Sequence, residues 1–313
     1  MFDLAVNDVV SLFKGGPWEL AFKTVPNVAT PNVPVWDVDP EQLAPSNIPA
    51  LMSALRANNR YIICYVNVGS LDTAKSDANQ FTAVTPTIVG AAYPGWPGEY
   101  FLDIRRNETR ALVKARLQRM ASYGCHAIEP DNLDSYSFSN GFGLTVNDAL
   151  DYMNWVAVSV HDLGMAVGLK NCGDLVTPHN LVPTFEFAVV ESCAESSGSC
   201  EQYAPFIQAG KPVFAAEYTD AGSGGCPIIS SVATACAATN GQGFEGIIKT
   251  CGLGADWQAC QTYDSNGYRA GQGAPGTSPP PGPTPSTSGA SPIDKSGPAA
   301  CMIVVMVGAL LAF

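Results

Sequence analysis

Eight short runs rich in β-forming residues alternate with helix-like segments, and this alternation constrains the fold more than any other feature of the chain. The runs are residues 18–22, 33–37, 61–67, 127–131, 166–170, 187–191, 212–217 and 244–249. Between them, residues 51–56, 111–120 and 149–161 carry apolar side chains three and four positions apart, as amphipathic helices do. Such alternation predicts a parallel sheet flanked by helices. Eight strands predict a single (β/α)8 TIM barrel domain over residues 18–270.

Polar or charged residues stand at the ends of most of these strands. They are Asp37, Asn67, Asp131, Lys170, Glu191, Glu217 and Lys249. In a (β/α)8 barrel the carboxyl ends of the strands surround one mouth, where the active site lies, so these side chains should converge there. A doubly wound open sheet is the alternative fold. It would require a glycine-rich turn after the first strand, whereas Gly15-Gly16 precedes that strand.

The densest group of acids ends the fourth run, in the sequence Glu129-Pro130-Asp131-Asn132-Leu133-Asp134. Side chains alternate between the two faces of a strand, so Glu129 and Asp131 share one face. Pro130 cannot donate to a sheet ladder, which indicates that the strand is ending here. We expect Glu129, one layer below Asp131, to be a buried acid paired with a lysine such as Lys170. An acidic surface turn is the alternative interpretation.

The residue types available for a barrel mouth favour carboxylate chemistry. The three histidines, His126, His161 and His179, show no paired ligand spacing, which disfavours a zinc hydrolase, and no Gly-x-Ser-x-Gly elbow is present. Two acids across a sugar-sized gap make a glycosidase, and about 5 Å between them suits retention of configuration. We expect a neighbouring Lys170 to keep one acid ionised and desolvation to raise the pKa of the other. An enolase-like site, with acids on Mg²⁺ and a lysine base, is a further alternative.

Several segments of the chain carry a family resemblance. They are WPGEYFLDIR at 96–105, GC at 124–125, EPDNLD at 129–134, GF at 141–142, GLKN at 168–171, ESC at 191–193, KPVF at 211–214 and EY at 217–218. In this order they resemble glycoside hydrolase family 114, the endo-α-1,4-polygalactosaminidases. The resemblance implies a (β/α)8 barrel that cuts α-1,4-linked galactosamine inside a polysaccharide, with retention and without a metal or cofactor. It also implies that Asp131 is the nucleophile and Glu191 the acid/base.

The resemblance extends to the residues around these two acids. It implies substrate binding, or control of the carboxylates' charge, for Tyr65, Asn67, Lys170, Asn171 and Glu217. Asp37, Asp103 and Asp134 become candidates for contacts to the sugar's ammonium or hydroxyl groups, and Trp96, in a loop at 94–98, for stacking on a sugar face. The chain departs from the family at His126, where Asp is more usual, and at Val190 and Ser192, where Asn and Gln are more usual.

The formal net charge of −12 bears on the partners of this protein. It disfavours nucleic acid, which is bound through clustered Lys and Arg, and suits a cationic or neutral partner such as an amino-sugar polymer. We expect a monomer that touches a membrane only through a lipid anchor. A wall-anchored, non-catalytic carbohydrate-binding barrel is the rival function.

Ten cysteines indicate an oxidising compartment. Cys193 and Cys200 close a short polar loop and are expected to form a disulfide. Cys226, Cys236, Cys251 and Cys260 allow three pairings that the sequence does not rank, whereas Cys64, Cys125 and Cys172 are interpreted as buried thiols. The sequon at Asn107 predicts a glycosylation site and agrees with secretion.

The two ends of the chain predict a cell-surface protein. Residues 271–288 form a Pro/Ser/Thr/Gly-rich linker, expected to be a disordered stalk. Residues 289–313, a polar spacer followed by an apolar tail, have the layout of a GPI-attachment signal with Ser288 as the attachment site. Residues 1–17 contain no apolar signal-peptide core, so we expect an incomplete gene model at that end.

Overall fold

The structure is a computed structural model, and it describes residues 17–22, 32–43, 45–195, 198–222, 225–254 and 256–262. Within these ranges all eight predicted strands are present. They are β1 (Trp18–Ala21), β2 (Val35–Val38), β3 (Tyr61–Asn67), β7 (Ala127–Asp131), β8 (Ala166–Lys170), β9 (Phe187–Glu191), β10 (Val213–Tyr218) and β11 (Glu245–Lys249). The predicted stalk, the GPI signal with Ser288, and residues 1–16 lie outside the described residues.

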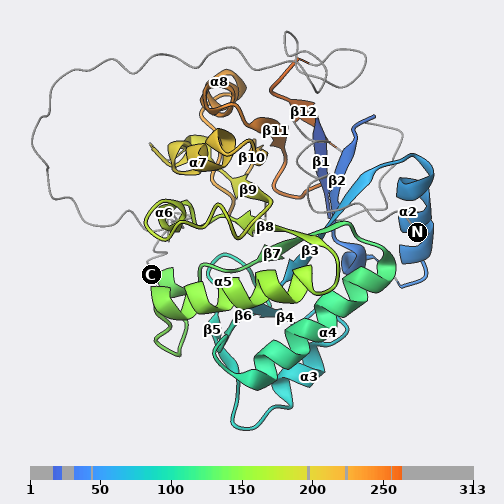
Figure 1. Ribbon diagram of the computed structural model, residues 1–313, viewed down its shortest axis with the longest axis vertical. Coiled ribbons are helices and arrows are strands. Elements are labelled where there is room, and N and C mark those ends of the chain that lie inside the picture. Colours follow the sequence, from blue (N-terminus) through green and yellow to red (C-terminus); the bar gives the residue numbers. More distant parts are fainter. Residues whose placement is uncertain are drawn as a thin grey trace, which may run out of the picture.

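The eight strands form a curled parallel sheet in which their spatial order follows the chain (Figure 1). A ninth strand, β12 (Gln258–Ala259), pairs antiparallel with β11. The two ends of the curl are joined by a hydrogen bond from a side chain to the backbone, because the indole Nε1 of Trp18 on β1 donates to the backbone carbonyl of Glu245 on β11 at 2.8 Å. The strand order contains no reversal of direction, so this is a TIM-barrel-like α/β fold and not the doubly wound sheet.

Helices cover the outer face of the sheet (Figure 1). The three predicted helical segments lie within α2 (Ile48–Ala57), α4 (Asn107–Tyr123) and α5 (Val146–His161). Local sequence sets their bounds: Thr145 and Asp148 form a capping box that starts α5, and Gly124, at φ 86°, ends α4 in the left-handed region. The remaining helices are α3 (Ala78–Thr82), α6 (Gly173–Val176), α7 (Ala204–Gln208), α8 (Val232–Gln242) and the 3₁₀ turns η1 (Pro40–Gln42), η2 (Ser135–Ser137), η3 (Cys193–Glu195) and η4 (Cys200–Tyr203).

The strand period of two divides the core into two clusters. Ile128 of β7 and Val167 of β8 belong to the cluster that contacts the helices, whereas Ala127, Ala166 and Phe187 belong to a separate cluster on the concave side. Residues an even number of positions further along each strand share that concave face. The end residues Asp131, Lys170 and Glu191 therefore stand above the inner cluster, as the sequence predicts.

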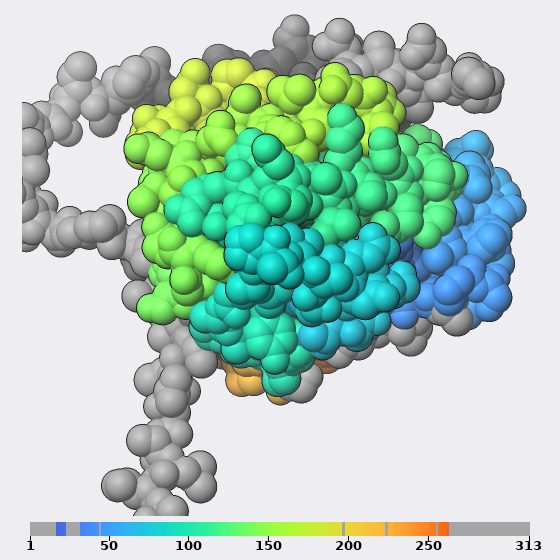
Figure 2. All heavy atoms as spheres, turned by 90° about the horizontal axis from the view of Figure 1, so that it is seen from below, coloured from blue at the N-terminus to red at the C-terminus, as the bar shows by residue number. Residues whose placement is uncertain are grey.

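A small antiparallel sheet inserted between β3 and α4 was not predicted. Its strands are β4 (Ser70–Asp72), β5 (Val89–Ala92) and β6 (Glu99–Leu102), in the order β4-β6-β5. Figure 2 shows the atoms of this insertion, in cyan, forming one continuous surface with those of α4 and α5, in green. The β5–β6 turn carries Trp96, which confirms the predicted loop at 94–98.

Four disulfides join the described cysteines. The expected Cys193–Cys200 bond is present, and the four later cysteines pair as Cys226–Cys251 and Cys236–Cys260. The interpretation of Cys64 and Cys125 as thiols is wrong, because they form a disulfide that ties β3 to the start of β7. The pair could not be recognised from the sequence, because the two cysteines are 61 residues apart and sequence distance does not report spatial distance. Cys172 is buried and takes part in none of these four disulfides, as expected.

The sequon residue Asn107 is exposed at the first position of α4. Among the described residues, no helix is both long and apolar enough to cross a membrane.

Candidate active site

A solvent-open cleft lies at the carboxyl ends of β3, β7, β8 and β9. Seven of the residues singled out from the sequence line it: Tyr65, Trp96, Asp131, Asp134, Lys170, Asn171 and Glu191. Four further lining residues were not singled out as site residues: Tyr93, Glu99, Asn132 and Leu133. The lining thus contains four carboxyl groups and one amine, which makes the cleft strongly anionic when its acids are ionised.

Lys170 is the centre of the charged groups on the concave face. Its Nζ lies 2.5 Å from Glu129 Oε1, 3.2 Å from Glu191 Oε2 and 3.7 Å from Asp131 Oδ1. Burial by itself disfavours the charged amine, but the three carboxylates outweigh it and hold the pKa of Lys170 well above its ordinary value. An amine that stays protonated cannot act as a base, which argues against the enolase-like alternative.

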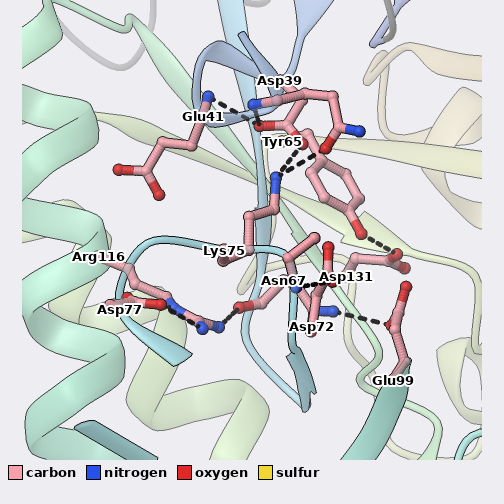
Figure 3. Close-up of polar contacts among 12 residues, drawn as sticks. Asp39, Glu41, Tyr65, Asn67, Asp72, Lys75, Asp77, Glu99, Arg116 and Asp131 are labelled. Carbon is pink, nitrogen blue, oxygen red and sulfur yellow. Dashed lines mark hydrogen bonds and ion pairs between the residues drawn. The ribbon is translucent and has the colours of Figure 1, made fainter. Parts of the chain in front are cut away.

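Asp131 receives a hydrogen bond from the hydroxyl of Tyr65, which donates to Oδ2 at 2.8 Å (Figure 3). Its side chain keeps 20% of its surface exposed, so a ligand in the cleft can reach it. The backbone turns into the left-handed region directly after Asp131, at Asn132 with φ 62°. A close approach fixes this turn, because a Cβ on Gly69 would lie 1.6 Å from the carbonyl oxygen of Asn132.

Glu191 is held from three sides. Tyr218 donates a hydrogen bond to Oε1, Lys170 contacts Oε2, and the backbone N–H of Glu191 donates to Asn171 Oδ1 at 3.0 Å. Burial alone would raise the pKa of Glu191, but Lys170 and the Tyr218 hydroxyl outweigh it and lower that pKa below its ordinary value. The sequence led us to expect a raised pKa at one of the two acids, and at Glu191 the structure shows the opposite.

Glu129 and Asp37 lie beneath the cleft. Glu129 is fully buried and paired with Lys170, as its place one layer below Asp131 predicts. Burial raises the pKa of Glu129 to about 7. The pKa of Asp37 is raised well above its ordinary value, first by burial and then by the charge of the nearby Glu129 carboxyl. Asp37 was expected to contact the sugar, but its side chain is completely buried and does not line the cleft.

Three other candidates from the sequence also lie outside the cleft lining. Asn67 is buried and contacts Ser70 and Glu99, and Asp103 forms a two-pronged ion pair with Arg105 at 2.8 and 3.0 Å. Glu217 accepts the backbone N–H of Ala194 at 3.0 Å, and burial raises its pKa to about 8. Neighbouring side chains use the polar atoms of Asn67 and Asp103, whereas Glu217 Oε2 is buried without a hydrogen-bond partner among the described residues.

The insertion contributes Tyr93, Trp96 and Glu99 to the lining of the cleft. Tyr93 donates to Asp134 Oδ1 at 2.9 Å, and burial raises the pKa of Asp134 to about 7. Trp96 stands on the lining with 36% of its surface exposed. Glu99, at the start of β6, contacts Asn67, and its carboxylate faces that of Asp131 (Figure 3). Neither strand period nor charge pattern distinguishes Glu99 from a surface acid, so only its place in the WPGEYFLDIR segment could have indicated it.

One group of three potential metal-ligating side chains occurs among the described residues, namely Cys193, Cys200 and Glu217. Both sulfurs belong to a disulfide, so the group offers a single carboxylate. This donor set does not fit a metal ion.

Two carboxylates that face one cleft at the carboxyl ends of a TIM-barrel-like sheet define a glycosidase. The comparison with known proteins gives the family: the chain belongs to glycoside hydrolase family GH114, whose sequence pattern matches residues 5–265. The expected family is thereby confirmed.

Two solved structures are similar to this chain along most of its length. The crystal structure of Aspergillus fumigatus Ega3 in complex with galactosamine is 28% identical, with a TM-score of 0.70, covering 79% of this chain and 96% of that one. The glycoside hydrolase domain of PelA from Pseudomonas aeruginosa is 17% identical, with a TM-score of 0.56, covering 76% of this chain and 95% of that domain, and at this identity it supports the fold alone. An uncharacterized protein of Thermotoga maritima is 30% identical over 77 residues, which span 24% of each chain.

Proposed function

We propose that this glycosidase cleaves internal α-1,4 linkages of a galactosamine-containing polysaccharide, with Asp131 as nucleophile and Glu191 as acid/base. The single observation that carries the proposal is the pair of carboxylates presented to one cleft and joined through Lys170. The similarity to Ega3, whose structure contains galactosamine, supports the substrate class. The anionic lining supports it independently, because an amino sugar with a free amine is a cation.

The spacing of the two acids supports retention of configuration. Asp131 Oδ1 and Glu191 Oε2 contact the same nitrogen at 3.7 and 3.2 Å. These two oxygens are therefore no more than about 7 Å apart, a separation that is compatible with the ~5–5.5 Å of retaining enzymes.

The proposed reaction has two steps. In the first, Asp131 attacks the anomeric carbon while Glu191 gives its proton to the glycosidic oxygen that leaves, so that a glycosyl ester forms on Asp131. In the second, Glu191 takes a proton from water, the water oxygen bonds to the anomeric carbon, and Asp131 leaves as a carboxylate. Lys170 and the Tyr65 hydroxyl orient the Asp131 carboxylate for its attack on the anomeric carbon.

The charge state of Glu191 favours a second candidate function. An acid whose pKa is lowered is largely ionised at neutral pH and has no proton to give. A non-catalytic carbohydrate-binding barrel is consistent with that state. In the catalytic account, Glu191 acquires its proton in acidic solution or when a bound sugar displaces water from the cleft.

We further propose that the protein acts outside the cell, attached to the surface by a GPI anchor at Ser288. The disulfides among the described residues support an oxidising compartment, and the anchor rests on the sequence of residues 289–313.

Cleavage of partly deacetylated poly-galactosamine by the wild type, Asp131→Asn and Glu191→Gln tests the catalytic proposal. Loss of either acid should reduce the rate by at least about a thousandfold, since each takes part in bond making or proton transfer. Asp162→Asn and Glu201→Gln make the same chemical changes at exposed positions and should leave the rate unchanged. Wild-type rates in both active-site variants would refute the assignment. Binding without cleavage by the wild type would establish the non-catalytic candidate.

A further inference from the structure

Glu99 is a third cleft carboxylate, and its two oxygens have different surroundings. Oε2 accepts a hydrogen bond from Asn67 Nδ2 at 3.0 Å (Figure 3). It also accepts from Ser70 Oγ at 2.7 Å and from Asn132 Nδ2 at 3.3 Å. No described residue donates a hydrogen bond to Oε1 in the same way. Figure 3 shows this second oxygen directed towards the carboxylate of Asp131.

The hydrogen bonds around Ser70 fix which atom can carry a proton. Both amides also donate to the Ser70 hydroxyl oxygen, Asn67 at 2.5 Å and Asn132 at 2.7 Å. The only hydrogen of that hydroxyl is therefore free to be donated to Glu99 Oε2. With three donors directed at it, Oε2 is a pure acceptor, and Oε1 is the atom of Glu99 that meets a ligand.

Two carboxylates side by side repel each other unless a cation lies between them. Burial, together with the charge of Asp131, raises the pKa of Glu99 to about 7 despite the three donors. The amine on the cleft lining, that of Lys170, is bound to Glu129 and Glu191. The free oxygen of Glu99 therefore suits a cationic group brought by the ligand.

The chemistry of galactosamine places such a group at this position. Its amine is on C2, the carbon next to the anomeric carbon that Asp131 attacks under the proposed function. A carboxylate beside the nucleophile is thus in reach of the amine of the same sugar. An N-acetyl group at C2 has no charge, keeps one N–H donor and adds bulk, so it would leave Glu99 desolvated without a counter-charge.

We propose that Glu99 determines specificity by binding the free ammonium of the sugar whose anomeric carbon Asp131 attacks. The inference rests on the proposed function for the identity of the attacked sugar. Under this proposal, Glu99 of the insertion selects against N-acetylated sugars. The two acids that perform the chemistry lie on other strands, β7 and β9.

Glu99→Gln isolates this role. The glutamine carbonyl can accept the same three hydrogen bonds, while its amide nitrogen replaces the free oxygen and turns an anion into a donor. We expect kcat/KM on a de-N-acetylated α-1,4-galactosamine oligomer to fall roughly 10- to 100-fold, the size of a lost charge-assisted hydrogen bond. On the N-acetylated oligomer of the same length the change should stay below about threefold. Glu201→Gln makes the same chemical change at an exposed position away from the cleft and should leave the ratio of the two rates unchanged.

Equal losses on both oligomers, or no loss on either, would overturn the proposal. Direct titration of each variant with galactosamine and with N-acetylgalactosamine provides a readout that does not need turnover. If the wild type cleaves neither oligomer, the proposed function fails, and selective weakening of galactosamine binding by Glu99→Gln would still support the role of Glu99. Equal binding of galactosamine by wild type and Glu99→Gln would refute it.

Discussion

Replacing Lys170 by methionine should destabilise the protein in a pH-dependent way. The Lys170 side chain is 3% exposed and its amine contacts three carboxylates. Methionine fills most of the same space but leaves those carboxylates in a poorly solvated site without a cation. Breaking a buried ion pair by removing one partner costs about 3–5 kcal/mol. At roughly 2–4 °C per kcal/mol for a domain of this size, the melting temperature at pH 8 should fall by about 6–20 °C.

The sign of the pH dependence follows from the same contacts. Without Lys170 the folded-state pKa of Glu129 rises further above its unfolded value, and the pKa of Glu191 is no longer held below its ordinary value. A raised carboxyl pKa costs stability at high pH, and the cost disappears as the pH falls towards the unfolded value near 4.5. The difference between wild type and Lys170→Met should therefore narrow from pH 8 to pH 5.

Calorimetric melting at both pH values provides the assay. Lys114→Met makes the same substitution at an exposed position of α4 and should change the unfolding free energy by less than about 0.5 kcal/mol. An unchanged melting temperature for Lys170→Met at pH 8 would contradict the electrostatic reasoning. So would a loss of equal size at pH 5, because that would indicate lost packing.

Three further predictions concern other parts of the molecule. Because Lys170 and Tyr218 outweigh burial and lower the pKa of Glu191, the protonated acid is scarce at pH 7, so kcat/KM should rise as the pH falls from 7 towards 5; a rate that rises towards pH 8 would argue against Glu191 as the acid. Glu217→Gln removes a carboxyl whose pKa is about 8, so it should stabilise the protein at pH 8.5 by up to about 4 kcal/mol and by little at pH 5, as measured by urea unfolding; equal effects at both pH values would exclude ionisation as the cause. Cys64→Ala with Cys125→Ala opens a loop of 61 residues, and the loss of its closure should cost about 4 kcal/mol in the same assay, whereas a change below 1 kcal/mol would contradict the chain-entropy reasoning.

The repeating part of the fold could be predicted because it depends on local pattern. Each of the eight strands buries one or both faces, so a β-rich run such as 61–67 can be recognised as a strand without knowing which strands pair with it. The strand period then places Glu129 below Asp131, and the pairing with Lys170 follows from the barrel arrangement. Both acids proposed for catalysis were found in this way, together with the family resemblance.

The inserted sheet of β4, β5 and β6 could not be predicted, because its position over the mouth depends on contacts between residues that are distant in the sequence. The strands β4, β5 and β6 have three or four residues each, too short for a periodic signal. Glu99 and Tyr93 reach the cleft only because this small sheet folds over the mouth. Asp37 shows the opposite error: a strand end predicts the direction of a side chain but not the depth at which it lies.

The anomeric configuration of the first product tests the central claim most directly. Proton NMR during cleavage of a defined α-1,4-galactosamine oligomer separates the α and β forms of the new reducing end before they interconvert. Because the two acids that share Lys170 are close enough for a covalent step, the account predicts that the α form appears first, and that Asp131→Asn gives neither form. A product that appears first in the β form would contradict it, since inversion needs no glycosyl ester on Asp131.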